Sequence, residues 1–145
     1  MYEKVIYPTD FSEGSGKVLE HLKQMKKYLG EVVILHVANK YGFDSVMEGC
    51  ERVGLDVKDV MNSLLKKEEE AAEKIRKDLE KEGIRCRIRI DVGDPASRII
   101  KTAEEENASA IIIGAHGKGF VDRLLLGSVT EKVLRQTTKP VVVIK

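Results

Sequence analysis

The sequence predicts an α/β protein built on a doubly wound, mainly parallel sheet of five strands with helices on both faces. Three observations support this prediction. Short apolar segments of strand composition alternate with longer segments of helical periodicity. Two of the apolar segments, 32–37 and 109–113, are nearly continuously apolar, which is typical of strands covered on both sides. The resulting order is β-α-β-α-β-α-β-α-β, which favours a parallel sheet connected by helices.

The chain has 145 residues, enough for a sizeable core, and we expect a single domain over residues 1–145. Its 25 basic and 24 acidic residues nearly cancel, so no general attraction to nucleic acid is expected. Tryptophan is absent and aromatic residues make up only 5%, which argues against a surface that stacks bases. Composition therefore predicts a globular protein that does not bind nucleic acid.

No apolar segment approaches the length that spans a membrane, and the first residues lack the apolar stretch of a signal peptide. We therefore expect a cytoplasmic protein without membrane association. Cys50 and Cys86 are far apart in the sequence and have no partners at metal-binding spacing. Two reduced thiols are the favoured interpretation, although a disulfide is compatible with the sequence.

The first predicted strand covers residues 5–7 and is closed by Pro8. Asp10 and Ser12 are residue types that favour helix N-caps, and a helix is predicted from there to Gly30. Apolar residues recur through this segment at helical spacing, namely Val18, Leu19, Leu22, Met25 and Leu29.

The second strand is predicted at 32–37. Residues 39–56 are mixed in character and contain three glycines, so a connection with at most a short helical turn is expected. A long helix is predicted over 57–79, with Gly83 ending it.

In the segment 84–90, apolar residues alternate with Arg85, Arg87 and Arg89, which predicts a strand with one wetter face at an edge of the sheet. The arginines could bind an anion, but a charged edge that resists strand addition is favoured. Asp94 and Pro95 predict a capped helix start. The strand at 109–113, a last helix and a final strand at 141–144 complete the sheet.

In such sheets, ligands bind beyond the carboxyl ends of the strands, where the strand order reverses. Three segments fit that position: 8–10 after the first strand, 37–39 after the second, and Gly114 onward after the fourth. The predicted strand order is 3-2-1-4-5, as in Rossmann-like folds. The sequence therefore predicts one composite site at this edge of the sheet.

The glycines after the fourth strand predict a phosphate site. Two stricter phosphate motifs fail, because Phe120 and Val121 replace the lysine and hydroxyl residue of a P-loop, and Asp122 replaces the last glycine of a dinucleotide fingerprint. Gly114 and Gly117 are expected to adopt backbone angles closed to other residues. Apolar residues of the segment 118–126, namely Phe120, Val121, Leu124, Leu125 and Leu126, are expected to anchor the loop on the core.

Beyond the loop, Gly127 is expected to let a phosphate approach the chain. Ser128 and Glu131 predict a capping box at the start of the last helix. The first-turn amides of that helix, at residues 128–130, would then face the anion.

The pattern G-x-x-G, nine residues, then G-S resembles the ATP-binding signature of the universal stress protein family. The resemblance extends over essentially the whole chain: the Pro8-Thr9-Asp10 turn, the strand ending at Val37, the Gly93-Asp94-Pro95 helix start and the closing strand all have counterparts.

The resemblance implies a site for ATP, or another adenine nucleotide, with Mg²⁺ or Mn²⁺ bound through the phosphates and Asp10. The implied contacts are Pro8, Thr9, Asp10, Val37, Ile113, Gly114, Gly117, Gly127, Ser128, Val129 and Thr130. Val37 would contact adenine through its backbone. His116 lies in the glycine loop, where it either touches a phosphate or is exposed. Asp10 also suits Mg²⁺ on its own chemistry, although capping the first helix is a compatible role.

No nucleophile–base pair is visible, and no lysine is placed as in a P-loop, so efficient phosphoryl transfer is not predicted. The favoured function is a nucleotide-dependent regulatory or stress-response module with a protein partner that the sequence does not identify. A slow ATPase and a nucleotide-free interaction protein are the alternatives. The apolar final strand could pair across a two-fold axis, and the resemblance also implies a homodimer through it.

Overall fold

Five strands form one sheet in the order β3-β2-β1-β4-β5, and each neighbouring pair is parallel. The computed structural model describes residues 1–117 and 125–145, apart from the side chains of residues 40–43. The strands are β1 (Tyr2–Pro8), β2 (Leu29–Asn39), β3 (Arg85–Gly93), β4 (Ala110–Gly114) and β5 (Val141–Ile144). The predicted α/β class, the parallel sheet and the strand order 3-2-1-4-5 are confirmed.

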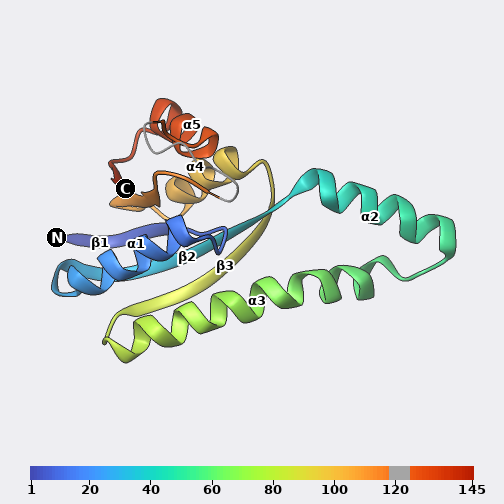
Figure 1. Ribbon diagram of the computed structural model, residues 1–145, viewed down its shortest axis with the longest axis horizontal. Coiled ribbons are helices and arrows are strands. Elements are labelled where there is room, and N and C mark those ends of the chain that lie inside the picture. Colours follow the sequence, from blue (N-terminus) through green and yellow to red (C-terminus); the bar gives the residue numbers. More distant parts are fainter. Residues whose placement is uncertain (118–124) are drawn as a thin grey trace.

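Helices cover both faces of this sheet (Figure 1). One face packs against α1 (Glu13–Gln24) and α3 (Val57–Lys81), and the other against α4 (Pro95–Glu105) and α5 (Ser128–Gln136). A further helix, α2 (Lys40–Val53), joins β2 to α3. In the part of the chain that is described, no helix is both long and apolar enough to cross a membrane.

Two apolar cores lie on the two faces of the sheet. The alternation of β1 divides its side chains between them, with Val5 and Tyr7 in the core under α1 and α3, and Ile6 in the core under α4 and α5. β2 divides in the same way. The central strands are therefore buried on both sides, as their nearly continuous apolar sequences predict.

The first helix is shorter than predicted. It ends at Gln24, a short 3₁₀ turn follows at Lys26–Tyr28, and β2 already begins at Leu29. Met25 and Leu29 pack against the first core from outside the helix, which explains why their spacing looked helical. Gly30 lies within β2, where a Cβ atom would be 2.3 Å from the Glu3 carbonyl oxygen of β1.

The prediction of a connection with little helix over 39–56 is wrong, because α2 is a helix of 14 residues. Its Gly49 lies in open space, so it weakens the helix without breaking it. Gly54, at φ +72°, is the glycine that marks the turn after the helix. Val46 and Cys50 stand one turn apart on the covered side of this helix.

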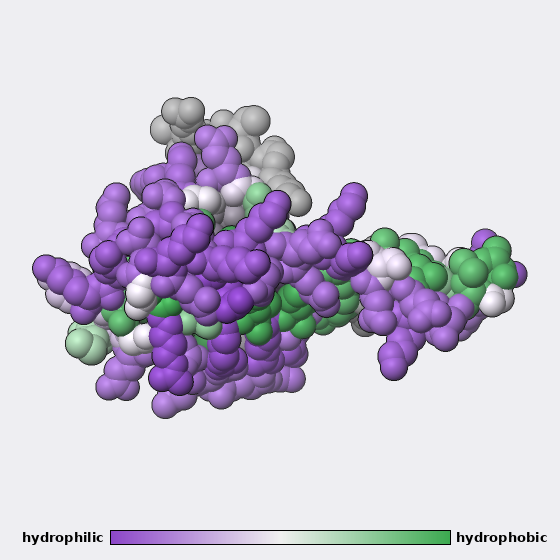
Figure 2. Space-filling model, turned by 90° about the horizontal axis from the view of Figure 1, so that it is seen from below, coloured by the Kyte–Doolittle hydropathy of each residue, from purple (hydrophilic) through white to green (hydrophobic). Residues whose placement is uncertain are grey.

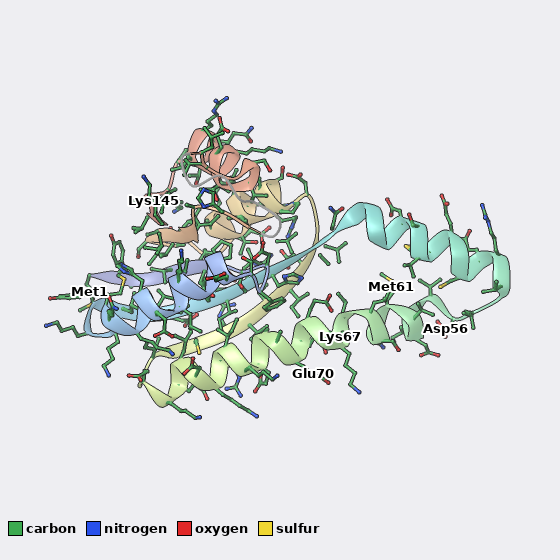
Figure 3. The ribbon with its side chains drawn as sticks, viewed as in Figure 1. Met1, Asp56, Met61, Lys67, Glu70 and Lys145 are labelled. Atoms are coloured by element: carbon green, nitrogen blue, oxygen red, sulfur yellow. The ribbon has the colours of Figure 1, made fainter. Side chains whose placement is uncertain are left out.

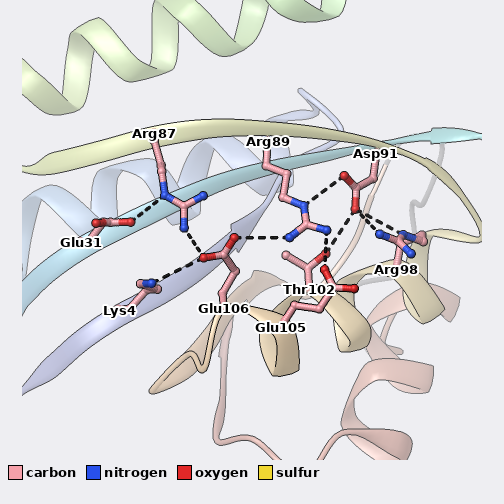
Figure 4. Close-up of polar contacts among 9 residues, drawn as sticks. All are labelled: Lys4, Glu31, Arg87, Arg89, Asp91, Arg98, Thr102, Glu105 and Glu106. Atoms are coloured by element: carbon pink, nitrogen blue, oxygen red, sulfur yellow. Dashed lines mark hydrogen bonds and ion pairs between the residues drawn. The ribbon is translucent and has the colours of Figure 1, made fainter.

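The arginines on the wetter face of the edge strand β3 belong to an ion-pair network (Figure 4). Arg87 pairs with Glu31 of β2 and with Glu106 after α4, and Arg89 pairs with Asp91 and Glu106. Both Cys50 and Cys86 are free thiols, as predicted, and burial raises the pKa of the Cys86 thiol to about 11.

Glu106 joins three cations of this network, and its replacement by glutamine should lower the free energy of unfolding at pH 7 by about 1 to 2 kcal/mol. Hydrogen bonding from Arg87 holds the pKa of the Glu106 carboxyl below its usual range. A lowered folded-state pKa contributes stability above the unfolded-state pKa of about 4.3, and that stability is lost as pH falls through the folded-state value.

The difference between wild type and Glu106→Gln in urea unfolding should therefore shrink from pH 7 to about pH 3. Glu20→Gln, which alters the exposed pair with Lys23, is the matched control and should change little at either pH. An equal destabilisation by Glu106→Gln at both pH values would contradict the electrostatic explanation.

Candidate functional site

A cavity of about 290 Å³ lies at the carboxyl ends of β1, β2 and β4. β1 stands between β2 and β4, so this is the point where the strand order reverses. All twelve residues predicted for the site line the cavity: Pro8, Thr9, Asp10, Val37, Ile113, Gly114, His116, Gly117, Gly127, Ser128, Val129 and Thr130. The sequence analysis missed four further lining residues, Ser15, Leu35, Pro95 and Ile99. Pro95 and Ile99 stand one turn apart in α4, and the sequence had marked Pro95 only as the start of that helix.

The lining of the cavity has two chemically different parts. Pro8, Leu35, Val37, Ile99 and Ile113 give it an apolar wall. The other part consists of the glycines, the first turn of α5 and the Asp10 carboxylate. The arrangement fits a ligand with a flat apolar body and an anionic tail.

The first turn of α5 lacks the predicted capping box. Gly127 is the N-cap, in an extended conformation at φ −62° and ψ 155°, and Ser128 is already the first helical residue. The Gly127 amide donates to the Ala115 carbonyl oxygen at 2.8 Å, and this tertiary bond sets the start of the helix. The Glu131 carboxylate pairs with Arg135 instead of reaching back.

As a consequence, the helix start opens on the cavity without a side-chain cap. The amides of residues 128–130 precede the first intrahelical bond, which runs from the Glu131 amide to Gly127. In contrast, α1, α3 and α4 are capped by Ser12, Asp56 and Asp94. The end of α5 thus offers backbone donors and a favourable helix dipole to an anion.

The glycines of the loop are required for close approach and not for unusual backbone angles. Neither Gly114 nor Gly117 has a positive φ, so that expectation is wrong. A Cβ atom on Gly114 would be 2.9 Å from the Gly14 carbonyl oxygen, and one on Gly117 would be 2.6 Å from the Asp10 Oδ2. Gly14 is itself tightly enclosed, because its Cβ atom would be 2.3 Å from the His116 carbonyl oxygen.

The turn after β1 is held by its own polar groups. The Thr9 hydroxyl shares a hydrogen bond with the Ser15 hydroxyl at 2.9 Å and accepts from the Phe11 amide at 3.0 Å. The Asp10 Oδ1 accepts from the Ser12 amide at 3.0 Å. Phe11 has φ +62°, which is rare for a residue with a side chain, so the turn is strained. Asp10 therefore projects from an ordered turn.

Two histidines contact carbonyl groups near the cavity. The His36 Nδ1 lies 2.9 Å from the Thr9 carbonyl oxygen, and its ring lies 4.6 Å from the Phe11 ring. His36 thus has a hydrogen-bond partner and is half-buried. The His116 Nε2 contacts the Leu125 carbonyl oxygen while His116 lines the cavity.

Only two of the five apolar residues predicted to anchor the loop are among the described residues. Leu125 is 60% exposed, so it does not anchor the loop as expected. Phe120, Val121 and Leu124 lie outside the described residues. Two hydrogen bonds fix the described sides of the loop: the Gly127 amide donates to the Ala115 carbonyl oxygen, and the Thr130 hydroxyl donates to the Gly114 carbonyl oxygen at 2.8 Å.

An ion pair fixes α4 against α5 next to the cavity. The Asp94 Oδ2 accepts from the Ser97 amide and hydroxyl and from the Lys132 ammonium at 3.0 Å. The hydrogen bonds from Ser97 and Lys132 lower the pKa of the Asp94 carboxyl to about 2. The predicted cap at Asp94, with Pro95 at the first helical position, is confirmed.

Within residues 1–117 and 125–145, no group of three or more His, Cys, Asp or Glu side chains is placed to hold a metal ion. Asp10 is the one carboxylate that lines the cavity among these residues. A single carboxylate suits Mg²⁺, which commonly keeps waters and binds one or two carboxylates together with phosphate oxygens. The residues present therefore fit a metal that arrives with a phosphate ligand, and do not form a closed metal centre.

These features define a doubly wound α/β protein with a ligand-sized cavity at its switch point and a helix start directed into it. The sequence model of the universal stress protein family matches residues 1–145. Universal stress protein MJ0577 of Methanocaldococcus jannaschii is 40% identical over 155 residues, which cover 100% of this chain and 96% of the relative. The chain belongs to the universal stress protein family.

The solved structure of MJ0577 matches with a TM-score of 0.86 at 39% identity, over 100% of this chain and 96% of that chain. Two more distant structures were solved with nucleotides. A universal stress protein in complex with cAMP has a TM-score of 0.61 at 19% identity, covering 99% of this chain and 96% of its own. The Arabidopsis thaliana family protein At3g01520 with AMP bound has a TM-score of 0.63 at 15% identity, covering 98% and 90%. At these identities the likeness of the last two concerns the fold.

Proposed function

We propose that this protein binds ATP in the cavity between β1 and β4 and acts as a nucleotide-dependent regulatory or stress-response module. The observation that carries the proposal is that one cavity is lined by both an apolar wall and an uncapped helix start. An adenosine needs the first and a phosphate chain needs the second. Bound cAMP and AMP in two proteins of this fold are compatible with that choice.

The adenine would lie against the end of β2. The Thr9 amide donates to the Leu35 carbonyl oxygen, so Leu35 directs its backbone groups toward β1. Because backbone groups alternate in direction along a strand, those of Val37 point the same way. β1 pairs with β2 only as far as Pro8 and Leu35, so the Val37 groups face the cavity beyond it. The Val37 backbone thus offers a donor and an acceptor beside the apolar wall, which supports recognition of the adenine edge.

The phosphates would lie at the start of α5, where the amides of residues 128–130 and the glycine loop surround them. Asp10 would hold Mg²⁺ or Mn²⁺ together with the phosphate oxygens. The metal would neutralise phosphate charge. The site supplies backbone donors and no side-chain nucleophile paired with a base among its described residues, so we propose regulation by binding, with at most slow hydrolysis.

We further propose that residues 1–145 act as one nucleotide-binding domain in the cytoplasm, responding to nucleotide by changing its contacts with a protein partner. The experiment that tests ligand identity is to denature the purified protein and analyse the supernatant for adenine nucleotides. Calorimetric titration of the stripped protein with ATP, ADP and AMP, each with Mg²⁺, then ranks the ligands. No extracted nucleotide and no heat at millimolar concentrations would refute the proposal.

Asp10→Asn should weaken ATP binding in the presence of Mg²⁺ by about tenfold, because it removes the carboxylate charge but keeps the Oδ1 acceptor for the Ser12 amide. With EDTA present, the variant and wild type should bind ATP almost equally. Glu13→Gln is the control, since Glu13 is exposed and does not line the cavity. A loss of the same size with and without metal would show that Asp10 acts by another route.

We also propose a homodimer through β5, which lies at the edge of the sheet beside β4. Pro140 and Ile144 direct carbonyl groups toward β4, so the intervening Val143 directs its amide outward. Val143→Pro should therefore remove a pairing donor from the open edge while keeping the bonds between β4 and β5. Sedimentation should show a lower average mass for Val143→Pro than for Val143→Ala. A dimer of unchanged affinity in the proline variant would exclude this edge.

A further inference from the structure

α2 and the first half of α3 project beyond the sheet as a helical hairpin, the arm, defined as residues 40–67 (Figure 1). α2 packs chiefly on α3 and on the end of β2. Among the described side chains of the arm, only Cys50 and Met61 are buried. Two helices in contact along one narrow seam have no second layer to cover their remaining apolar side chains.

Apolar side chains are unusually frequent on the outside of the arm. Met47, Val53, Leu55 and Leu64 are 40%, 69%, 58% and 44% exposed, which is four of the nine large hydrophobic side chains exposed in the described residues. Figure 2 shows hydrophobic surface on the projecting end of the molecule beside hydrophilic surface. Single exposed apolar residues are ordinary on protein surfaces, but such a cluster on one hairpin indicates a contact surface.

The charge pattern on one face of α3 indicates which partner binds the arm. On α3, Val60, Leu64 and Lys67 lie on one face at spacings of four and three. Asp56, the N-cap, precedes Val60 by four residues, so this face has an acid at its start and a base farther along. Figure 3 shows Asp56 at the start of α3 and Lys67 farther along the helix. Met61 is buried and so belongs to a different face. Lys67 is exposed and forms no ion pair with any described residue.

We propose that this face of α3 binds the same face of a second copy of the chain, packed antiparallel about a two-fold axis beside residue 62. Val60 then lies against Leu64 of the partner subunit, and Asp56 lies within one position of Lys67 of the partner subunit. The two-fold axis repeats each contact, so the acid–base pair forms twice around an apolar centre. The two arms together form an antiparallel four-helix bundle. The arm lies apart from β5, so this contact is separate from the proposed strand-linked dimer.

Disulfide trapping tests the register directly. Cys50 and Cys86 are first replaced by alanine, and Val60→Cys and Leu64→Cys are then introduced together. Mild oxidation with copper phenanthroline should give a covalent dimer on a non-reducing gel. The matched control, Lys58→Cys with Asn62→Cys, has the same spacing on another face of α3 and should remain monomeric. Equal trapping in both pairs, or none in the first, would overturn the proposal, as would a different protein occupying this face.

Charge reversal provides an independent readout by sedimentation velocity. Lys67→Glu should lower the average mass because two carboxylates then meet on each side of the axis. Lys67→Arg, which keeps the positive charge, should leave the mass unchanged. Circular dichroism verifies that both variants keep their helices. A mass unaffected by Lys67→Glu, or lowered equally by Lys67→Arg, would contradict the antiparallel contact.

Discussion

Gly14→Ala should lower the free energy of unfolding by about 2 to 3 kcal/mol, despite the better helix propensity of alanine. The Cβ atom would lie 2.3 Å from the His116 carbonyl oxygen, whereas Cβ contacts below 3.0 Å are essentially absent from real structures. The clashing atom is backbone, so no side-chain rotation relieves it. The chain around His116 must move away from α1, and the glycine loop that lines the cavity moves with it.

Gly16→Ala is the matched control for this substitution. It lies two residues farther along α1, and a Cβ atom there would meet nothing within 4 Å. This variant should be as stable as wild type or more stable by up to about 1 kcal/mol. Urea unfolding of the three proteins measures the difference. If Gly14→Ala were as stable as Gly16→Ala, then α1 and the loop would not be in the close contact described.

The fold could be predicted from the sequence because its signals are local and agree with one another. The nearly continuous apolar sequence of β2 and the alternation in β3 distinguish a central strand from an edge strand, and both positions were correct. The position of the cavity followed from topology, since the carboxyl ends of β1 and β4 meet where the strand order reverses. Placing the cavity thus needed the order of elements more than their bounds.

The details that could not be predicted depend on tertiary contacts. The capping box failed because a bond from the Gly127 amide to Ala115, twelve residues away, moved the helix start by one residue. The glycines of the loop were expected to adopt backbone angles closed to other residues. Whether a glycine is needed for a positive φ or for close packing depends on the chain beside it, which for Gly114 is Gly14. The partners of Arg87 are 56 and 19 residues away in sequence, so its ion pairs carry no local signal.

Ser128→Pro should weaken ATP binding by roughly tenfold to a hundredfold while leaving the fold intact. Ser128 is the first helical residue of α5, a position that proline favours because its amide has no intrahelical partner. The preceding Gly127 has ψ 155°, the extended conformation that a following proline requires. The substitution therefore removes one backbone donor from the proposed phosphate site without breaking a bond of the helix.

Ser128→Ala separates the amide from the hydroxyl, because it removes the side-chain oxygen and keeps the N–H group. If backbone donors hold the phosphates, the alanine variant should bind ATP nearly as wild type does, and the loss should appear only with proline. Calorimetric titration with ATP and Mg²⁺ measures affinity, and thermal unfolding without ligand shows whether α5 is preserved. A large loss in both variants would assign the contact to the hydroxyl. Unchanged binding in both would place the phosphates elsewhere than at the start of α5, and the uncapped helix end would then need another explanation.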